Sequence, residues 1–210
     1  MTARRWRPVA WVLVAAGIGL VAYAAYIPAK AWLAQWLLDA AWDRRIAASG
    51  SPRPWPWADL APMARLRQPR LGINQVVLDD ASARSLAFGP AHVRGSARPG
   101  THGNVVLSAH RDTHFRWLAA LRDGDELLLE DAEGGVRGYR VVEREIRDQS
   151  DSTLLDPLAG DQLRLVTCYP FDAVRPGTPL RFVVTALPLP SASAAPRPRR
   201  NGFARADVVL

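Results

Sequence analysis

The chain has 210 residues, of which 49% are hydrophobic and 22% are charged, and its net charge at pH 7 is +7. This length allows one ordinary domain with short appendages, and the composition excludes a collagen, an acidic disordered protein and a disulfide-stabilised scaffold. The single cysteine also excludes an intrachain disulfide and any zinc site built from two or more cysteines.

The positive charge is concentrated at the two ends of the chain. Residues 1–8 contribute +3 and residues 191–210 another +3, which leaves only +1 for residues 9–190. Because nucleic-acid binding needs a basic surface on the folded domain, this nearly neutral body argues against a nucleic-acid partner. We predict that residues 1–8 form a basic cytoplasmic tail. Residues 189–210, rich in proline, alanine, serine and arginine, are predicted to be a disordered basic tail.

Residues 9–27 form an apolar run of 19 residues without a charge. As an α-helix this run would measure about 28 Å, close to the thickness of the hydrocarbon core of a bilayer. Arg4, Arg5 and Arg7 precede it, and positive residues of this kind keep the N-terminus in the cytoplasm. The run therefore predicts a single-pass membrane anchor. A cleaved signal peptide is the alternative.

Residues 28–60 are predicted to connect this anchor to the domain that follows. Within residues 29–48, tryptophan and leucine recur at spacings of three and four. This periodicity indicates an amphipathic helix that packs on the domain or lies on a membrane surface. Residues 49–57 contain three prolines and two tryptophans, a composition typical of an extended linker.

Short apolar runs separated by turn residues fill residues 61–188, which we predict to be one domain. Short helical turns are expected at residues 116–122 and 152–158. Many short strands without long helices between them indicate a mainly β fold, either a compact barrel or a sandwich, rather than a parallel α/β sheet. The predicted strands cover residues 64–66, 75–78, 104–108, 126–130, 136–145, 162–167 and 180–186.

Three residues at the ends of predicted strands are candidates for catalysis. Cys168 ends the apolar run LRLVTC, and His110 ends the run NVVLSAH. A thiolate is a nucleophile, and an imidazole can exchange protons with it or with the substrate. Arg181 opens the last strand and is a fixed cation that could stabilise an oxyanion. The alternatives are a buried structural cysteine and an ordinary surface arginine.

The other histidines, His92, His102 and His114, compete with His110 for this role. His114 follows His110 by four residues, and on a helix that spacing would allow both imidazoles to bind one metal ion. The run contains no glutamate, and a third ligand would have to come from elsewhere in the chain. We therefore predict no metal site and no other cofactor.

The chain also resembles the sortases, which are membrane-anchored cysteine transpeptidases. The resemblance rests on three segments, PGTHGNVVLSAHRDTHF (99–115), LRLVTCYPF (163–171) and TPLRFVVTA (178–186). The family pattern has a histidine at a strand end, then a TLxTC-type strand end, then an arginine on the next strand. Arg164 stands at the first threonine of that pattern. The segments WPWADLAPMARL (55–66) and LAFGPAHVRGSARPGTHGN (86–104) are most similar to the Gram-negative subgroup called class GN.

This resemblance implies a closed, eight-stranded β-barrel with short helices, preceded by a transmembrane helix in the bacterial inner membrane. The catalytic domain would lie in the periplasm. Cys168 would be the nucleophile, His110 the general acid and base, and Arg181 the stabiliser of the oxyanion, while Thr167 would contact the substrate. The implied substrate is a protein with a C-terminal LPxTG-like sorting signal, which is transferred to an amine acceptor without a cofactor.

Three other functions are alternatives to this one. An L,D-transpeptidase has a histidine and a glycine directly before its cysteine, whereas Val166 and Thr167 occupy those positions here. A sortase that polymerises pilins is compatible with every motif in the chain. The third alternative is a membrane-tethered β module that only binds a partner, with Cys168 in a structural role.

Overall fold

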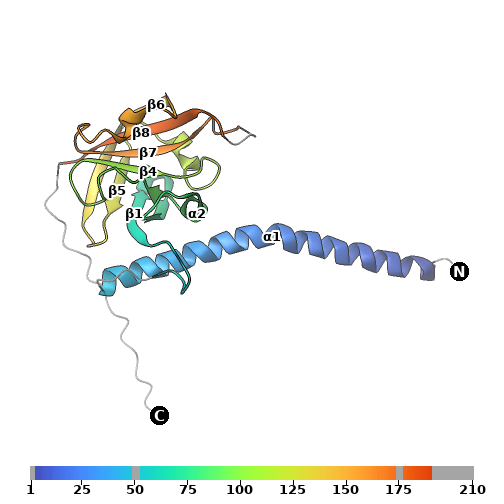
Figure 1. The fold of residues 1–210 in the computed structure, drawn as a ribbon. Coiled ribbons are helices and arrows are strands. Elements are labelled where there is room, and N and C mark those ends of the chain that lie inside the picture. The colour runs from blue at the N-terminus through green and yellow to red at the C-terminus, as the bar shows by residue number, and fades with distance from the viewer. Residues whose placement is uncertain (1–2, 49–52, 174–176, 191–210) are drawn as a thin grey trace, which may run out of the picture.

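The computed structural model describes residues 3–48, 53–173 and 177–190, which form a long helix attached to a closed β-barrel (Figure 1). Their elements in chain order are α1 (Ala3–Ala48), β1 (Pro62–Gln68), η1 (Pro69–Leu71), β2 (Ile73–Leu78), α2 (Ala83–Leu86), β3 (Ala91–His92), β4 (Asn104–Ser108), η2 (Arg116–Ala120), β5 (Glu126–Glu130), β6 (Val136–Asp148), η3 (Ser152–Leu155), β7 (Gln162–Tyr169) and β8 (Leu180–Pro188).

The strands close in the order β1-β2-β3-β4-β7-β8-β6-β5, and β5 pairs back onto β1. Neighbouring strands are antiparallel except for two parallel pairs, β2 with β3 and β4 with β7. Because parallel strands run in the same direction, the C-terminal ends of β4 and β7 meet at one edge of the barrel. The mainly β fold predicted from the short apolar runs is confirmed, and the barrel is closed as the family resemblance implied.

Alternating apolar side chains fill the barrel interior. Leu163 and Leu165 of β7 are fully buried there together with Val105 and Leu107 of β4. Their period of two matches the strand pleat, which turns every second side chain inward. Burying apolar surface at about 25 cal/mol per Å² is the main stabilisation of such a core. The strand residues that alternate with these core residues therefore face the outside of the barrel.

The C-terminal part of α1 packs on the outer face of β2. Leu38 and Trp42 are buried against Val76 and Leu78 of that strand, and Leu60 from the segment after the helix joins them. The amphipathic periodicity of residues 29–48 therefore belongs to a helix that covers the barrel. We call this surface the α1 face and define it by these five residues.

The N-terminal part of α1 projects away from the barrel (Figure 1). It contains the uncharged run of residues 9–27. Among the residues that the structure describes, no helix combines the length and apolar character that crossing a membrane requires. Of the predicted cytoplasmic tail at residues 1–8, residues 3–8 are part of α1 and residues 1–2 lie outside the described residues. Residues 191–210 of the predicted C-terminal tail and residues 49–52 at the start of the predicted linker also lie outside them.

Candidate active site

The parallel pairing of β4 and β7 sets the register between the segment that leads to His110 and the segment that carries Cys168. Just beyond β4, the Ala109 N–H donates to the Val166 carbonyl at 3.3 Å. The Thr167 hydroxyl donates to the Ala109 carbonyl at 2.7 Å, across a sequence separation of 58 residues. The same separation relates every residue pair of the β4–β7 ladder, which ends at Ser108 and Val166. Two residues beyond that last pair, His110 and Cys168 have the same separation in the sequence.

Arg181 lies on the other side of Cys168. β8 pairs antiparallel with β7, and Arg181 stands directly opposite Cys168 in the register. Residues directly opposite each other in such a pair point to the same face of the sheet. Cys168 of β7, Arg181 of β8 and His110, two residues beyond the end of β4, are the set that we call the thiol row.

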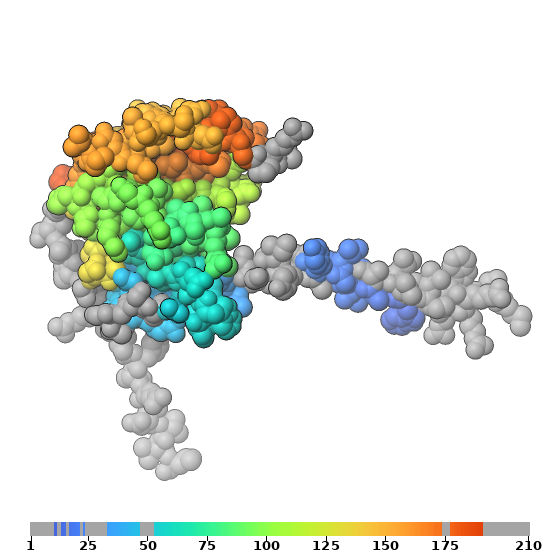
Figure 2. All heavy atoms as spheres, viewed as in Figure 1, coloured from blue at the N-terminus to red at the C-terminus, as the bar shows by residue number. Residues whose placement is uncertain are grey.

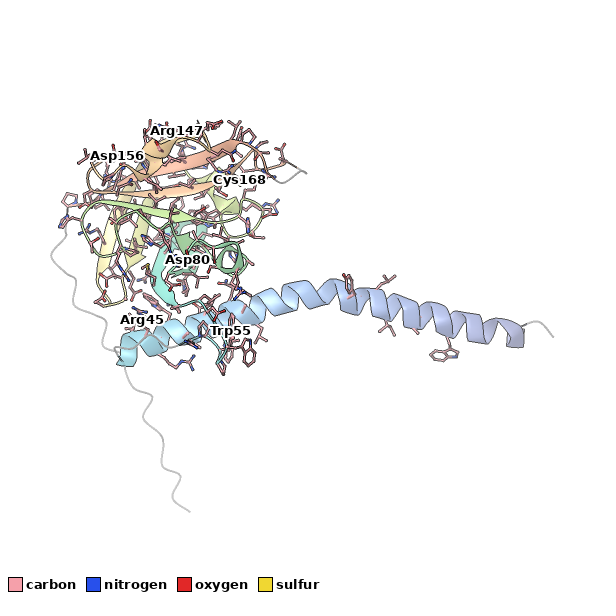
Figure 3. The ribbon with its side chains drawn as sticks, in the orientation of Figure 1. Arg45, Trp55, Asp80, Arg147, Asp156 and Cys168 are labelled. Atoms are coloured by element: carbon pink, nitrogen blue, oxygen red, sulfur yellow. The ribbon has the colours of Figure 1, made fainter. Side chains whose placement is uncertain are left out.

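The thiol row lies on the outer face of the barrel. Leu165 belongs to the interior core, whereas the next residue, Val166, belongs to a cluster on the outside, so Cys168 faces outward as well. Cys168 is a free, half-buried thiol on the side of the barrel remote from α1 (Figure 3). His110 is exposed and Arg181 is half-buried. All three side chains are therefore accessible to a ligand from solvent.

The Thr167 side chain faces the interior and is only 1% exposed. Its hydrogen bond to the Ala109 carbonyl ties the end of β7 to the end of β4. In this structure the Thr167 hydroxyl therefore bonds the chain itself, and the bond links the residue before His110 to the residue before Cys168.

The guanidinium of Arg181 is held only by neutral acceptors among the described residues. Its Nη1 donates to the carbonyls of Thr178 at 2.7 Å and Leu180 at 2.9 Å. Its Nη2 donates to Oε1 of Gln149 at 2.9 Å. No described carboxylate forms an ion pair with it, so its positive charge is not cancelled by a direct partner.

Arg147 of β6 stands directly opposite Arg181, yet its surroundings differ. Carboxylate oxygens of Glu145 and Asp151 each lie 2.8 Å from its guanidinium. These bonds raise the pKa of Arg147 above its ordinary value. Hydrogen bonds from Thr153, together with Arg147, hold the pKa of Asp151 at about 2. Arg147 is therefore locked into an ion-pair network, and Arg181 is the row's available cation.

An apolar cluster lies on the same outer face as the thiol row. Val106, Val166 and Val183 pack there beneath Leu154 of η3. η3 is fixed at its start by Asp151, whose carboxylate accepts the backbone N–H two residues later at 2.9 Å. β6, the turn after it and β8 form the part of the surface farthest from the packed end of α1 (Figure 2). We call Val106, Leu154, Val166 and Val183 the η3 face.

Among the described residues, no hydrogen bond joins the three side chains of the thiol row to one another. Without a ligand, catalytic hydrogen bonds are often long and tighten only when substrate binds. The arrangement nevertheless offers a nucleophile, a proton carrier and a fixed cation within one row. Such a set suits attack on a carbonyl carbon followed by protonation of a leaving group.

Two of the competing histidines have other partners. His92 is buried, and its Nε2 lies 3.0 Å from the Ala97 carbonyl in the turn between β3 and β4. His102 is exposed and its Nδ1 lies 2.8 Å from a carboxylate oxygen of Asp161. Neither belongs to the outer face of β4 and β7 at the thiol row.

His114 is the histidine with the most perturbed surroundings. Burial holds its pKa below the ordinary value, a hydrogen bond with the Ala87 backbone acts in the opposite direction, and the charge of His110 lowers it further. Residues 111–115 form a turn. They are not the α-helix on which a spacing of four would bring His110 and His114 to one metal ion.

Two residues at the site carry no sequence signal of their own. Arg111 is buried and donates to the Thr178 hydroxyl at 3.1 Å and to the Ala173 carbonyl at 2.9 Å. It therefore ties the residue after His110 to the β7–β8 connection. Gln149 lies in a polar turn, a context in which glutamine is common and indicates nothing.

A protein-family model described as "Sortase domain" matches residues 66–189. Sortase D of Bacillus subtilis (strain 168) is 32% identical over 120 residues, which cover 57% of this chain and 60% of that protein. The match thus spans less than two thirds of that relative's own length.

Solved structures show the same fold. Sortase C-1 from Actinomyces oris superimposes with a TM-score of 0.55 at 25% identity, over 61% of this chain and 75% of that chain. Sortase A from Corynebacterium diphtheriae superimposes with a TM-score of 0.57 at 22% identity, over 79% of this chain and 86% of that chain.

Proposed function

Because the chain belongs to the sortase family, we propose that it is a cysteine transpeptidase acting on a C-terminal sorting signal of the LPxTG type. The observation that carries this proposal is the thiol row, in which Cys168 of β7 stands opposite Arg181 of β8 and His110 follows the end of β4, the strand that pairs with β7 on its other side. The order and spacing of these residues follow the family pattern along the chain.

In the first half of the reaction, the Cys168 thiolate attacks the carbonyl carbon of the threonine in the signal. N–H groups of Arg181 donate to the oxyanion that develops on the carbonyl oxygen. His110, in its protonated form, gives its proton to the glycine nitrogen as the carbon–nitrogen bond breaks. The products are a thioester on Cys168 and a free C-terminal peptide.

In the second half, an amine acceptor attacks the thioester carbon. His110, now neutral, takes the proton that the amine loses, and the Cys168 thiolate leaves as the new amide forms. Arg181 again faces the oxyanion. One proton carrier serves both halves, because the proton that it releases in the first half is regained in the second.

We further propose that residues 9–27 anchor the chain in the bacterial inner membrane with the barrel in the periplasm, and that the chain belongs to the class GN subgroup. The uncharged run and the preceding arginines support the anchor. The segments at residues 55–66 and 86–104 support the subgroup. Membrane fractionation of the full chain, before and after deletion of residues 1–27, tests the anchor. Recovery of the undeleted chain in the soluble fraction would contradict it.

The catalytic proposal is tested with a fluorogenic peptide that contains LPETG, in the presence of hydroxylamine. Hydroxylamine is a strong nucleophile that captures a thioester as a hydroxamate. The wild-type chain should cleave the peptide and release the hydroxamate. Cys168→Ala should do neither while it keeps its far-UV circular dichroism and its unfolding midpoint.

Arg181→Ala should slow turnover by at least about 10²-fold, the scale of losing one oxyanion donor. Arg140→Ala is the matched control, because Arg140 is an arginine of β6 that pairs with the carboxylate of Glu126 on β5, and neither strand carries a residue of the thiol row. Cleavage that survives unchanged in Cys168→Ala would leave the non-catalytic binding module as the better description.

A further inference from the structure

Gln149 connects the β6–β7 turn to the start of β8 through two contacts. Its backbone N–H donates to the Pro179 carbonyl at 2.7 Å. Its side-chain Oε1 accepts from Nη2 of Arg181 at 2.9 Å. The first contact fixes the backbone of Gln149 relative to β8, so the second presents its amide oxygen to the guanidinium from a defined place.

The acceptor that Gln149 offers to Arg181 is a neutral amide oxygen, although carboxylates lie nearby in the chain. Asp148 directly precedes Gln149, but its carboxylate accepts from the Ser150 N–H at 2.9 Å and from the Ser150 hydroxyl at 2.6 Å. These bonds lower the pKa of Asp148, and the more distant charge of Arg181 contributes less. Asp151 is turned to Arg147 instead. The side chain that reaches Arg181 is thus the neutral one.

A neutral acceptor orients a guanidinium and leaves its positive charge in place. A carboxylate orients the guanidinium but also offsets that charge. The three bonds of Arg181 to Thr178, Leu180 and Gln149 use Nη1 and Nη2. Its Nε–H has no acceptor among the described residues. An oxyanion beside Cys168 would therefore meet a guanidinium that is fixed in place, fully charged and still able to donate.

We propose that Gln149 is a positioning residue that holds Arg181 in the thiol row through a neutral hydrogen bond. Gln149 acts through Arg181 and makes no contact with substrate. This inference rests on the proposed function, because it assigns Arg181 to the same reaction. It goes further by naming a residue outside the family motifs on which the arginine depends.

The first test is a double-mutant cycle on the full chain with the LPETG peptide. Gln149→Met keeps the length of the side chain but removes the acceptor, and it should lower kcat by about 10-fold with KM nearly unchanged. In an Arg181→Ala background the same substitution should cost nothing more. Wild-type turnover in Gln149→Met, or an equal loss in both backgrounds, would overturn the positioning role.

The second test does not need turnover. Cys168 is the chain's single cysteine, so iodoacetamide labelling followed by mass spectrometry reports on that thiol alone. Gln149→Glu gives Arg181 a carboxylate partner, which should move the pH midpoint of Cys168 labelling upward, since the thiolate loses the help of the cation. Asn74→Asp, on the exposed side of β2, adds the same charge elsewhere and should leave the midpoint in place.

These two tests separate the inference from the proposed function. A wild-type chain that cleaves no sorting peptide contradicts the function, and the labelling experiment still decides whether Gln149 reaches Cys168 through Arg181. To test whether the effect passes through Arg181, the change in the Cys168 labelling midpoint caused by Gln149→Glu is measured again in the Arg181→Ala background. A shift of the same size without the arginine would overturn the inference, and a clearly smaller one supports it.

Discussion

Two outer faces of the barrel are buried by additional elements, and they differ in how completely they are closed. On the α1 face, a long helix buries Leu38 and Trp42 against β2. On the η3 face, a single turn of four residues contributes Leu154 to a cluster of valines. The long helix α1 leaves neither strand residue of the α1 face, Val76 or Leu78, accessible to solvent. The short cover protects the valines and leaves the adjacent thiol row open.

The difference assigns stability and chemistry to separate places. A helix with many buried contacts stabilises the fold, whereas a short capped turn costs little to arrange around a reactive side chain. Figure 3 shows this separation, with Trp55 beside α1 and Cys168 on the far side of the barrel. Substitutions on the two faces should therefore affect different measurements.

The largest expected effect is on the thiol row. His110→Ala should lower turnover of the LPETG peptide by about 10²- to 10⁴-fold, the usual contribution of a general acid and base. The unfolding midpoint should hardly change, because His110 is exposed and makes no hydrogen bond to another side chain of the row. His102→Ala is the matched control, since it removes an exposed imidazole near Asp161. Equal losses in both variants would contradict a specific role for His110.

The next largest effect is expected on the α1 face. Trp42→Ala should destabilise the fold by about 3–5 kcal/mol, the cost of emptying a buried tryptophan site. Urea unfolding followed by circular dichroism measures this loss. Trp36→Ala, on the same helix but 58% exposed, should cost less than about 0.5 kcal/mol. Turnover per folded molecule should survive both substitutions, and a selective loss of kcat in Trp42→Ala would break the division between the faces.

Leu154→Ala tests the short cover and should cost about 2 kcal/mol, the lower end for a buried leucine, because 9% of this side chain is already exposed. Unlike Trp42→Ala, it should also speed iodoacetamide labelling of Cys168 under native conditions, since η3 lies next to the thiol row. Leu158→Ala, in the same β6–β7 connection but 90% exposed, is the control and should change neither quantity. Unaltered labelling in Leu154→Ala would show that η3 does not limit access to the thiol.

The strands that surround the site could be predicted more readily than its cover. β4, β5 and β7 have apolar runs that end in turn residues, and the predicted ranges lie within or match the observed ones. β3 has only two residues, too few for any alternation to show. The β4–β7 pairing joins segments that are 58 residues apart. Hydrophobic patterning indicates which residues face inward but not which strands become neighbours.

The same limit explains what was missed at the site. Cys168, His110 and Arg181 could be predicted as candidates because each stands at the end of a predicted strand, a common place for active groups on a rigid scaffold. Gln149 and Arg111 act through contacts with Arg181 and with the β7–β8 connection. Those contacts form only when the barrel closes, so no local sequence pattern predicts them.

The smallest expected effect concerns His114, whose backbone carbonyl accepts a hydrogen bond from Nε2 of Gln75 on β2 at 2.9 Å. Burial lowers its pKa from the ordinary 6.5, so the unfolded chain binds this proton more readily than the folded chain. The neutral imidazole therefore contributes stability that is fully present above pH 6.5 and declines as the pH falls below that value toward the lower folded pKa. The free energy of unfolding of the wild-type chain, measured in urea, should fall as the pH is lowered over that interval. In His114→Asn it should depend less on pH. Turnover of His114→Asn at pH 8 should match the wild type, where the imidazole is neutral in either state. A loss of activity without a change in stability would instead assign His114 to the active site. The division between the covered surface and the thiol row would then not hold for this residue.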